Sequence, residues 1–115
     1  MKKTKMLKKN YEFRNVLSKG KYYSGKNIEA FIKENNKDIN FLGLAISTKI
    51  GKAVKRNNIK RIIRECYKNI EPEIKTGISI VFLCKKNADF NNIKYIDIKS
   101  DIDYILDKAN SRIQE

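Results

Sequence analysis

The chain lacks histidine and tryptophan and carries only two cysteines and one proline. Without histidine, the commonest general base and the commonest metal ligand are both missing. Cys66 and Cys84 are far apart and form no CxxC pair, so the sequence favours neither a zinc site nor a disulfide framework. Both cysteines fall within apolar patterns, which predicts small core residues in a reducing compartment.

Long apolar runs are also missing. No segment approaches the roughly twenty apolar residues of a membrane span. The first ten residues, MKKTKMLKKN, are charged and are not followed by an apolar stretch, so they do not resemble a signal peptide. We therefore expect a soluble, cytoplasmic protein.

Acidic residues are scarce beside basic ones. The 115 residues contain 26 Lys and Arg against 13 Asp and Glu, a net charge of +13. Residues 1–27 carry +8 and residues 49–68 carry +7, so the remainder is slightly acidic. Charge confined in this way is typical of a nucleic-acid-binding protein. The length predicts a single RNA-binding domain spanning residues 1–115, with residues 1–9 as a flexible basic leader.

The segment 49–68 combines this charge with a helical pattern. Apolar residues recur at three- and four-residue spacing and share one face: Ile59, Ile62, Ile63, Cys66, Tyr67 and Ile70. A helix docked through that face would hold its basic rows rigidly enough to match a spaced array of phosphates. A solvated helix face normally interleaves acids with its bases, and Glu65 is the only acid here.

Two strands are predicted before this helix. In residues 27–33 the side chains alternate, and Phe31 projects from the more polar face. In residues 41–47 one face is large and apolar, and the other is small: Gly43, Ala45 and Ser47. If Phe31 shares a side with the small residues, the sheet presents a groove with an aromatic wall, which could stack unpaired bases. An aromatic in this position can equally be a packing residue.

The remaining elements suggest an α+β fold. Asn10 is predicted to cap a helix that ends before Gly20, and the apolar run 78–84 predicts a strand buried on both faces. The spacing from Ile98 to Ile113 predicts a closing helix with acids on its outer side. The expected architecture is a small α/β sandwich, with helices on a roughly four-stranded mixed sheet in the order α-β-β(-β)-α-β-α.

Residues 51–65, GKAVKRNNIKRIIRE, resemble the signature helix of the bacterial ribonuclease P protein subunit, in which a basic RNR-centred motif precedes KR and RE. Other landmarks agree in order and spacing: LKK at 7–9, Phe13, Gly20, GLAIS at 43–47, Lys49 and the strand leading to Lys85. The resemblance therefore covers nearly the whole chain.

The resemblance implies an accessory subunit of ribonuclease P, which pairs with a large catalytic RNA to cut the 5′ leader from precursor tRNA. The RNA would carry the Mg²⁺-dependent hydrolysis, so the protein alone would bind no cofactor, and neither a small-molecule substrate nor a membrane is expected. The implied fold is like domain 2 of ribosomal protein S5, with a left-handed βαβ crossover against the usual handedness.

The resemblance also implies two groups of site residues. The contacts to the catalytic RNA would come from Lys52, Arg56, Asn57, Lys60, Arg61, Arg64 and Lys68. The cleft for the single-stranded leader would be lined by Phe13, Leu17, Phe31, Ser47, Lys49 and Lys85. Two positions depart from the family pattern: Asn58 stands where a second Arg is usual, and Leu17 stands where an aromatic is common.

Three other functions stay open. A ribosomal or other RNA-packing protein would need the same basic helix without a catalytic partner. A nuclease acting alone would need clustered acids or a histidine pair, and the sequence has neither pattern. A membrane-surface helix would need an exposed aromatic or leucine-rich face, which the basic helix does not have.

Overall fold

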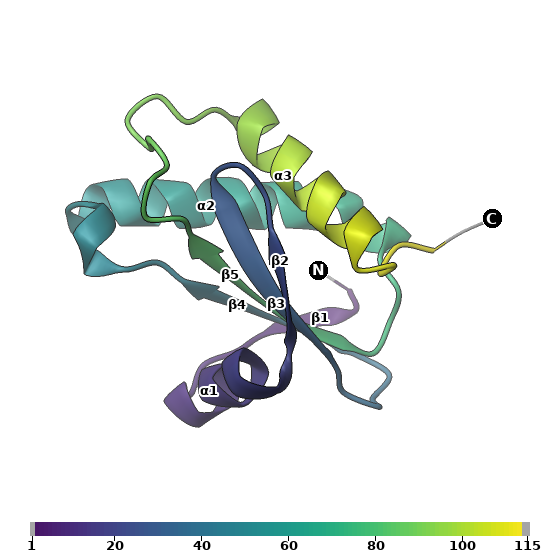
Figure 1. Cartoon of the computed structure of the whole chain (residues 1–115). Helices are drawn as coiled ribbons and strands as arrows, with labels where there is room; N and C mark the ends of the chain where they lie inside the picture. Colours follow the sequence, from purple (N-terminus) through teal and green to yellow (C-terminus); the bar gives the residue numbers. More distant parts are fainter. Residues whose placement is uncertain (1, 114–115) are drawn as a thin grey trace.

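The computed structural model describes residues 2–113, which form three helices and one five-stranded sheet (Figure 1). The strands are β1 (Thr4–Met6), β2 (Lys21–Ser24), β3 (Ile28–Glu34), β4 (Asn40–Ala45) and β5 (Ile78–Cys84). The helices are α1 (Asn10–Lys19), α2 (Ala53–Ile70) and α3 (Tyr95–Lys108), and two 3-10 turns flank α2: η1 (Thr48–Ile50) and η2 (Glu71–Glu73). The predicted α+β sandwich with a mixed sheet is confirmed, with five strands instead of roughly four.

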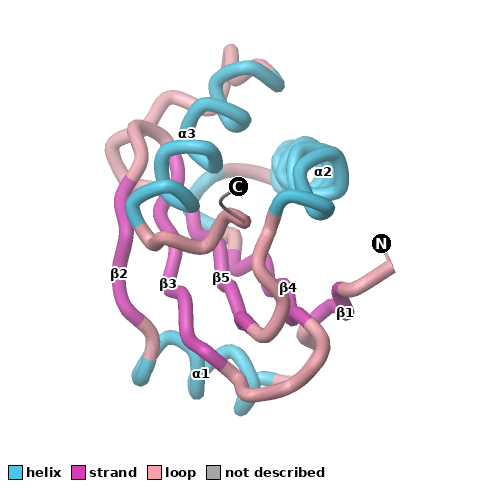
Figure 2. Tube along the Cα trace, turned by 90° about the vertical axis from the view of Figure 1, so that its right-hand side faces the viewer, coloured by secondary structure: helices cyan, strands magenta, loops and turns pink. Residues whose placement is uncertain are grey.

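The sheet has the order β1-β4-β5-β3-β2. The pairs β1–β4 and β4–β5 are parallel, whereas β3 pairs antiparallel with both β5 and β2. Helix α1 lies on one face of the sheet, while α2 and α3 lie together on the other (Figure 2). We call these the α1 face and the α2/α3 face.

The connection from β4 through α2 to β5 is left-handed. Both strands run towards the left in Figure 1, so in Figure 2 they recede from the viewer. In that view the chain rises from β4, returns through α2 above the sheet and enters β5 to the left of β4. A path that turns anticlockwise as it recedes is left-handed, unlike nearly all βαβ units.

The two faces of the sheet are packed unequally. On the α2/α3 face, the register partners Ile32, Ile80 and Leu42 lie in one row within the main core. The α1 face has a smaller packed area, where α1 contacts β3 and β5 and both Val16 and Val81 are buried. Much of the α1 face is therefore not covered by the helix.

The N-terminal segment is not a free leader, so that prediction is wrong for the described residues 4–6. Thr4–Met6 forms the edge strand β1 beside β4. Its Thr4 Oγ1 lies 2.8 Å from the Tyr67 hydroxyl, within hydrogen-bonding distance. The Tyr67 side chain is fully buried in α2, so this contact ties the N-terminal strand to the core.

The start of α1 also differs from the prediction. Asn10 is the first helical residue and does not cap the helix. Instead the Glu12 carboxylate accepts hydrogen bonds from the backbone N–H groups of Lys9, at 2.9 Å, and Lys8, at 3.2 Å. These bonds, chiefly the one from Lys9, lower the pKa of Glu12 because they favour its charged form.

Helix α3 begins before Ile98 and ends before Ile113, the two limits that the apolar spacing predicted. It spans Tyr95–Lys108, and Ile113 lies beyond it and is exposed. One acid of this helix is not on the outer side. Asp101 is buried and accepts hydrogen bonds from the backbone N–H groups of three residues in the β2–β3 turn: Lys26 (3.0 Å), Asn27 (2.7 Å) and Ile28 (3.1 Å). Through Asp101, α3 holds the end of the β2–β3 hairpin.

Candidate nucleic-acid interface

Helix α2 is docked through the apolar face that its sequence predicts. All six residues of that face are buried: Ile59, Ile62, Ile63, Cys66, Tyr67 and Ile70. The helix is shorter than the basic segment, because it begins at Ala53 and Lys49 lies in the separate turn η1. The basic side chains along α2 are therefore displayed from a rigid support.

Six of the seven predicted RNA-subunit residues lie on α2, outside its buried apolar face, and Lys52 immediately precedes the helix. Most are exposed, whereas Arg56 and Lys60 are partly covered. Arg56 Nη1 donates a hydrogen bond to the Gly51 carbonyl at 2.7 Å, which closes the N-terminal end of the helix. Within residues 2–113, the side chains of Lys60, Arg64 and Lys68 have no hydrogen-bond or ion-pair partner. Their ammonium and guanidinium groups are available for an external anion.

Arg61 is oriented by its neighbours on the helix. Its Nη1 lies 3.0 Å from Glu65 Oε1, and its Nη2 donates to Asn58 Oδ1 at 2.9 Å. Asn58 thus acts on this surface by positioning the Arg61 guanidinium. Both partners of the Arg61–Glu65 pair are more than half exposed, so the pair can open at little cost.

On the α1 face, the condition for a groove is met. The register places Phe31 beside Val81, and Val81 beside Gly43, so the aromatic residue and the small floor share one side of the sheet. Phe13 of α1 lies directly over the floor, in contact with the bare backbone at Gly43. The predicted aromatic wall and small floor therefore lie on the same face of the sheet, with Val81 of β5 between them.

A hollow of about 410 Å³ opens where α1, the end of β4 and α2 meet. Its lining includes Phe13 and Ser47, both predicted for the leader, and Lys60, predicted for the RNA subunit. Ser47 Oγ accepts a hydrogen bond from the Lys49 N–H at 3.2 Å, so Lys49 lies beside the same rim. The two predicted surfaces meet at this hollow.

Three predicted leader residues lie outside this hollow: Phe31 is on β3 beside Val81, and the other two are Leu17 and Lys85. Leu17 is half-buried on α1 and is not part of the hollow's lining. Lys85 follows the C-terminal end of β5, and its Nζ reaches towards β2, where it donates to Ser24 Oγ at 2.8 Å and to the Gly25 carbonyl at 3.1 Å. The predicted cleft residues are therefore spread across the α1 face instead of forming one pocket.

A second hollow of about 540 Å³ flanks α1 on its other side, and sequence reasoning missed it. It combines basic with aromatic side chains: Arg14, Lys33 and Lys37 with Tyr11 and Phe41. Lys37 Nζ lies 5.5 Å from the centre of the Phe41 ring, a cation–π contact. Phe41 is the register partner of Ser79, which in turn pairs with Lys33. The alternation of side chains along β3 and β4 could therefore have predicted that Lys33 and Phe41 share a face.

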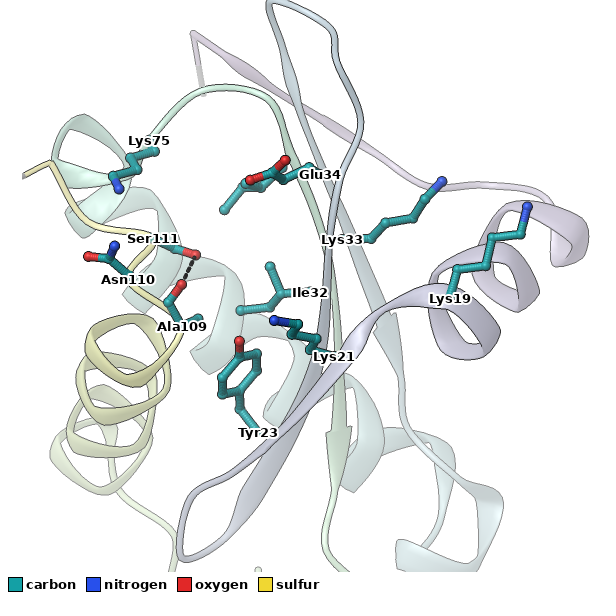
Figure 3. Close-up of a pocket in the computed structure, with 11 residues that line it drawn as sticks. Lys19, Lys21, Tyr23, Ile32, Lys33, Glu34, Lys75, Ala109, Asn110 and Ser111 are labelled. Carbon is teal, nitrogen blue, oxygen red and sulfur yellow. Dashed lines mark hydrogen bonds between the residues drawn. The ribbon is translucent and has the colours of Figure 1, made fainter.

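A third hollow, of about 550 Å³, lies on the α2/α3 face and contains none of the predicted site residues (Figure 3). Lys21, Tyr23 and Lys75 border it, whereas Lys19 and Lys33 point away to the other side of β3 (Figure 3). The end of α3 also borders it, and the partial negative charge of a helix C-terminus opposes a bound anion. Volume alone therefore does not make it the RNA site.

Acids and thiols within residues 2–113 do not assemble into a reactive centre. No three His, Cys, Asp or Glu side chains in this range converge as metal ligands. Burial raises the pKa of the Cys66 thiol to about 11 and that of Cys84 to about 12, so both are uncharged at neutral pH. The prediction that both cysteines pack with the core is confirmed. In the same range, no helix is both long enough and apolar enough to cross a bilayer.

Comparisons with known proteins give the family to which the chain is similar. The family model described as Ribonuclease P matches residues 1–110. A "Ribonuclease P protein component" of Clostridium botulinum (strain 657 / Type Ba4) is 40% identical over 108 residues, covering 93% of this chain and 96% of the relative.

Solved structures give the same result. The RNase P protein of Staphylococcus aureus superimposes with a TM-score of 0.81 at 27% identity, over 92% of this chain and 95% of that one. The RNase P protein of Thermotoga maritima, at 23% identity, shares the fold with a TM-score of 0.82, over 96% of this chain and 99% of that one.

Proposed function

The chain belongs to the ribonuclease P protein component family, and from this premise we propose that it is the protein subunit of bacterial ribonuclease P. In this role it binds the catalytic RNA through α2 and the 5′ leader of precursor tRNA along the α1 face. Cleavage of the leader is carried out by the RNA, and the protein raises affinity for the precursor. Its place of action is the cytoplasm, where precursor tRNA is processed.

The position of Lys60 carries this proposal. Its side chain belongs to the basic side of α2 and also lines the hollow that holds Phe13 and Ser47. An RNA bound to α2 therefore lies next to the opening of the α1 face. A leader strand that leaves the catalytic RNA at this point enters the groove without crossing open solvent.

The α1 face suits a single strand better than a duplex. Its aromatic residues Phe13 and Phe31 offer flat surfaces for unpaired bases. Lys85 offers a cation beside the end of β2. Stacking tolerates any base because every base has a π-face, as a leader of varied sequence requires. The exposed cations of α2 instead suit the regularly spaced phosphates of a folded RNA.

We assign the magnesium ions of the holoenzyme to the RNA. Within residues 2–113, no three His, Cys, Asp or Glu side chains converge as metal ligands. Of the acids in this range, Glu73, Asp103 and Asp107 are paired with Arg112, and Asp101 accepts hydrogen bonds from backbone N–H groups.

Cleavage of a 5′-extended precursor tRNA tests the proposal. A bacterial ribonuclease P RNA is assayed at low Mg²⁺ with and without the protein, and the protein is assayed alone. We expect the protein to stimulate the RNA and to cut nothing by itself. Binding without any change in rate or in precursor affinity would instead favour an RNA-packing protein, and cleavage by the protein alone would favour an independent nuclease.

A further inference from the structure

The aromatic surface of the α1 face does not end at Phe31. In the antiparallel register, Tyr22 of the edge strand β2 is the direct partner of Phe31. The two ring centres lie 5.3 Å apart, with an angle of 59° between the ring planes. Tyr22 is 52% exposed, so Phe31 covers part of the ring and the rest is open to a ligand.

The open ring is held in place by an acid. The Tyr22 hydroxyl donates a hydrogen bond to Glu29 Oε2 at 2.5 Å. This bond restrains the orientation of the ring, and it also raises the pKa of Tyr22 because it favours the neutral hydroxyl. The Glu29 carboxylate also repels a phosphate at this position. A nucleotide that settles here is therefore favoured to present its base and to turn its phosphate away.

A cation lies in the adjacent row of the sheet. Ser24 is the register partner of Glu29, and Lys85 Nζ donates to Ser24 Oγ. The edge of the sheet thus combines a fixed aromatic ring, an acid that excludes phosphate from it, and a nearby ammonium group. This is the combination that a single-stranded RNA needs when one base stacks and the next phosphate is neutralised.

We infer that Tyr22 is a second stacking site for an unpaired leader base, placed beyond the site at Phe31. The inference rests on the proposed function, because that function sets the direction in which the RNA leader crosses the sheet. The leader enters beside α2 at the β4 side and must cross three strand spacings of about 4.8 Å each to reach β2. Tyr22 therefore meets a base farther from the cleavage point than Phe31 does.

Leader length separates the two sites. Precursor tRNAs whose leaders are lengthened one nucleotide at a time are titrated with the reconstituted holoenzyme, under conditions in which cleavage is slow. For the wild type we expect affinity to rise in steps as the leader reaches each aromatic residue. Tyr22→Ala should remove only the last step, about 5- to 150-fold for one stacked base, and leave shorter leaders unaffected.

Two further variants distinguish stacking from packing. Tyr22→Leu keeps an apolar cover over Phe31 but lacks a flat ring, so it should also lose the last step. Tyr22→Phe keeps the ring and loses only the bond to Glu29, so it should retain most of that step. Tyr104 on α3 has the same 52% exposure, and Tyr104→Ala should bind every leader as the wild type does.

The outcomes identify which idea fails. Equal loss at all leader lengths in Tyr22→Ala, no loss at all, or wild-type affinity in Tyr22→Leu would each overturn the stacking site while leaving the proposed function intact. A wild-type holoenzyme whose affinity does not depend on the leader would overturn the proposed function itself, and the inference with it.

Discussion

The ring of Phe13 occupies the space that a side chain at position 43 would need. A Cβ built on Gly43 would lie 2.6 Å from Phe13 Cε1 and 3.0 Å from Leu7 Cδ1. The glycine in the GLAIS segment is therefore required for close approach, since it lets an aromatic of α1 rest on the backbone of β4. The floor of the groove and its first aromatic residue are one steric unit.

Gly43→Ala should consequently displace Phe13. We expect a loss of about 1 to 3 kcal/mol in the free energy of unfolding, as for other overpacked sites, together with weaker binding of precursor tRNA. Denaturant unfolding and precursor titration measure the two effects. In the double variant Gly43→Ala/Phe13→Leu the smaller side chain should relieve the clash and recover part of the stability. Strictly additive losses would show that the two residues do not interact.

Arg64→Ala should weaken binding to the catalytic RNA and lower the slope of log K against log[salt] by about one unit. Arg61→Ala should have the same effect, although the wild-type Arg61 must break its ion pair with Glu65 before it can bind a phosphate. Lys108→Ala, which removes a cation from the end of α3, outside the predicted RNA-contact residues, is the matched control and should leave the slope nearly unchanged. Unaltered slopes in both Arg variants would contradict the assignment of α2 to the RNA.

Phe31→Ala should act on the leader. If Phe31 stacks on a leader base, precursor tRNA should bind about 1 to 3 kcal/mol more weakly, while mature tRNA should bind as before. The ratio of the two dissociation constants is the measurement, since it cancels any general loss of folded protein. An equal loss for both RNAs would mean that Phe31 only packs against Tyr22 and Val81.

Asp101→Ala should destabilise the fold severely. It would leave the backbone N–H groups of Lys26, Asn27 and Ile28 without their acceptor, and the buried one, at Ile28, alone costs about 1 to 3 kcal/mol when unpaired. Asp107→Ala on the same helix is the control, because that carboxylate is exposed and its loss should change stability by less than about 0.5 kcal/mol. Similar melting temperatures for the two variants would contradict the capping role.

Stability should fall at alkaline pH through the buried thiols. The folded pKa of Cys66 is about 11, against an ordinary value of 9.0, so between these values the unfolded chain has lost a proton that the folded chain keeps. Stability from this group is complete below pH 9 and declines as the pH rises through 11. Cys84 acts in the same direction, up to about 12, and Tyr67, whose pKa burial also raises, adds to it.

Denaturant unfolding at pH 8 and at pH 10.5 measures this decline. The double variant Cys66→Ala/Cys84→Ala is less stable at pH 8 because it leaves cavities, but it should lose less stability between the two pH values. A decline as steep as that of the wild type would mean that the thiols ionise equally in both states.

The sequence by itself determined those features that depend on neighbours along the chain. The spacing of six apolar residues was enough to orient α2, because each turn of a helix fixes which side chains share a face. The largely apolar run of β5 was likewise enough to predict a strand that is mostly buried. The alternation in β3 and β4 assigned Phe31 and Gly43 to faces, but it did not show that the two faces were the same.

Only the tertiary structure decided the contacts between distant segments. Thr4 meets Tyr67, Asp101 caps the β2–β3 turn, and Lys60 shares a hollow with Phe13, although none of these pairs is close in sequence. A three-residue strand such as β1 has no periodicity of its own and is stabilised by β4, while the left-handed path of α2 is a property of three elements together. Such features depend on packing across the whole domain, for which no local pattern carries a signal.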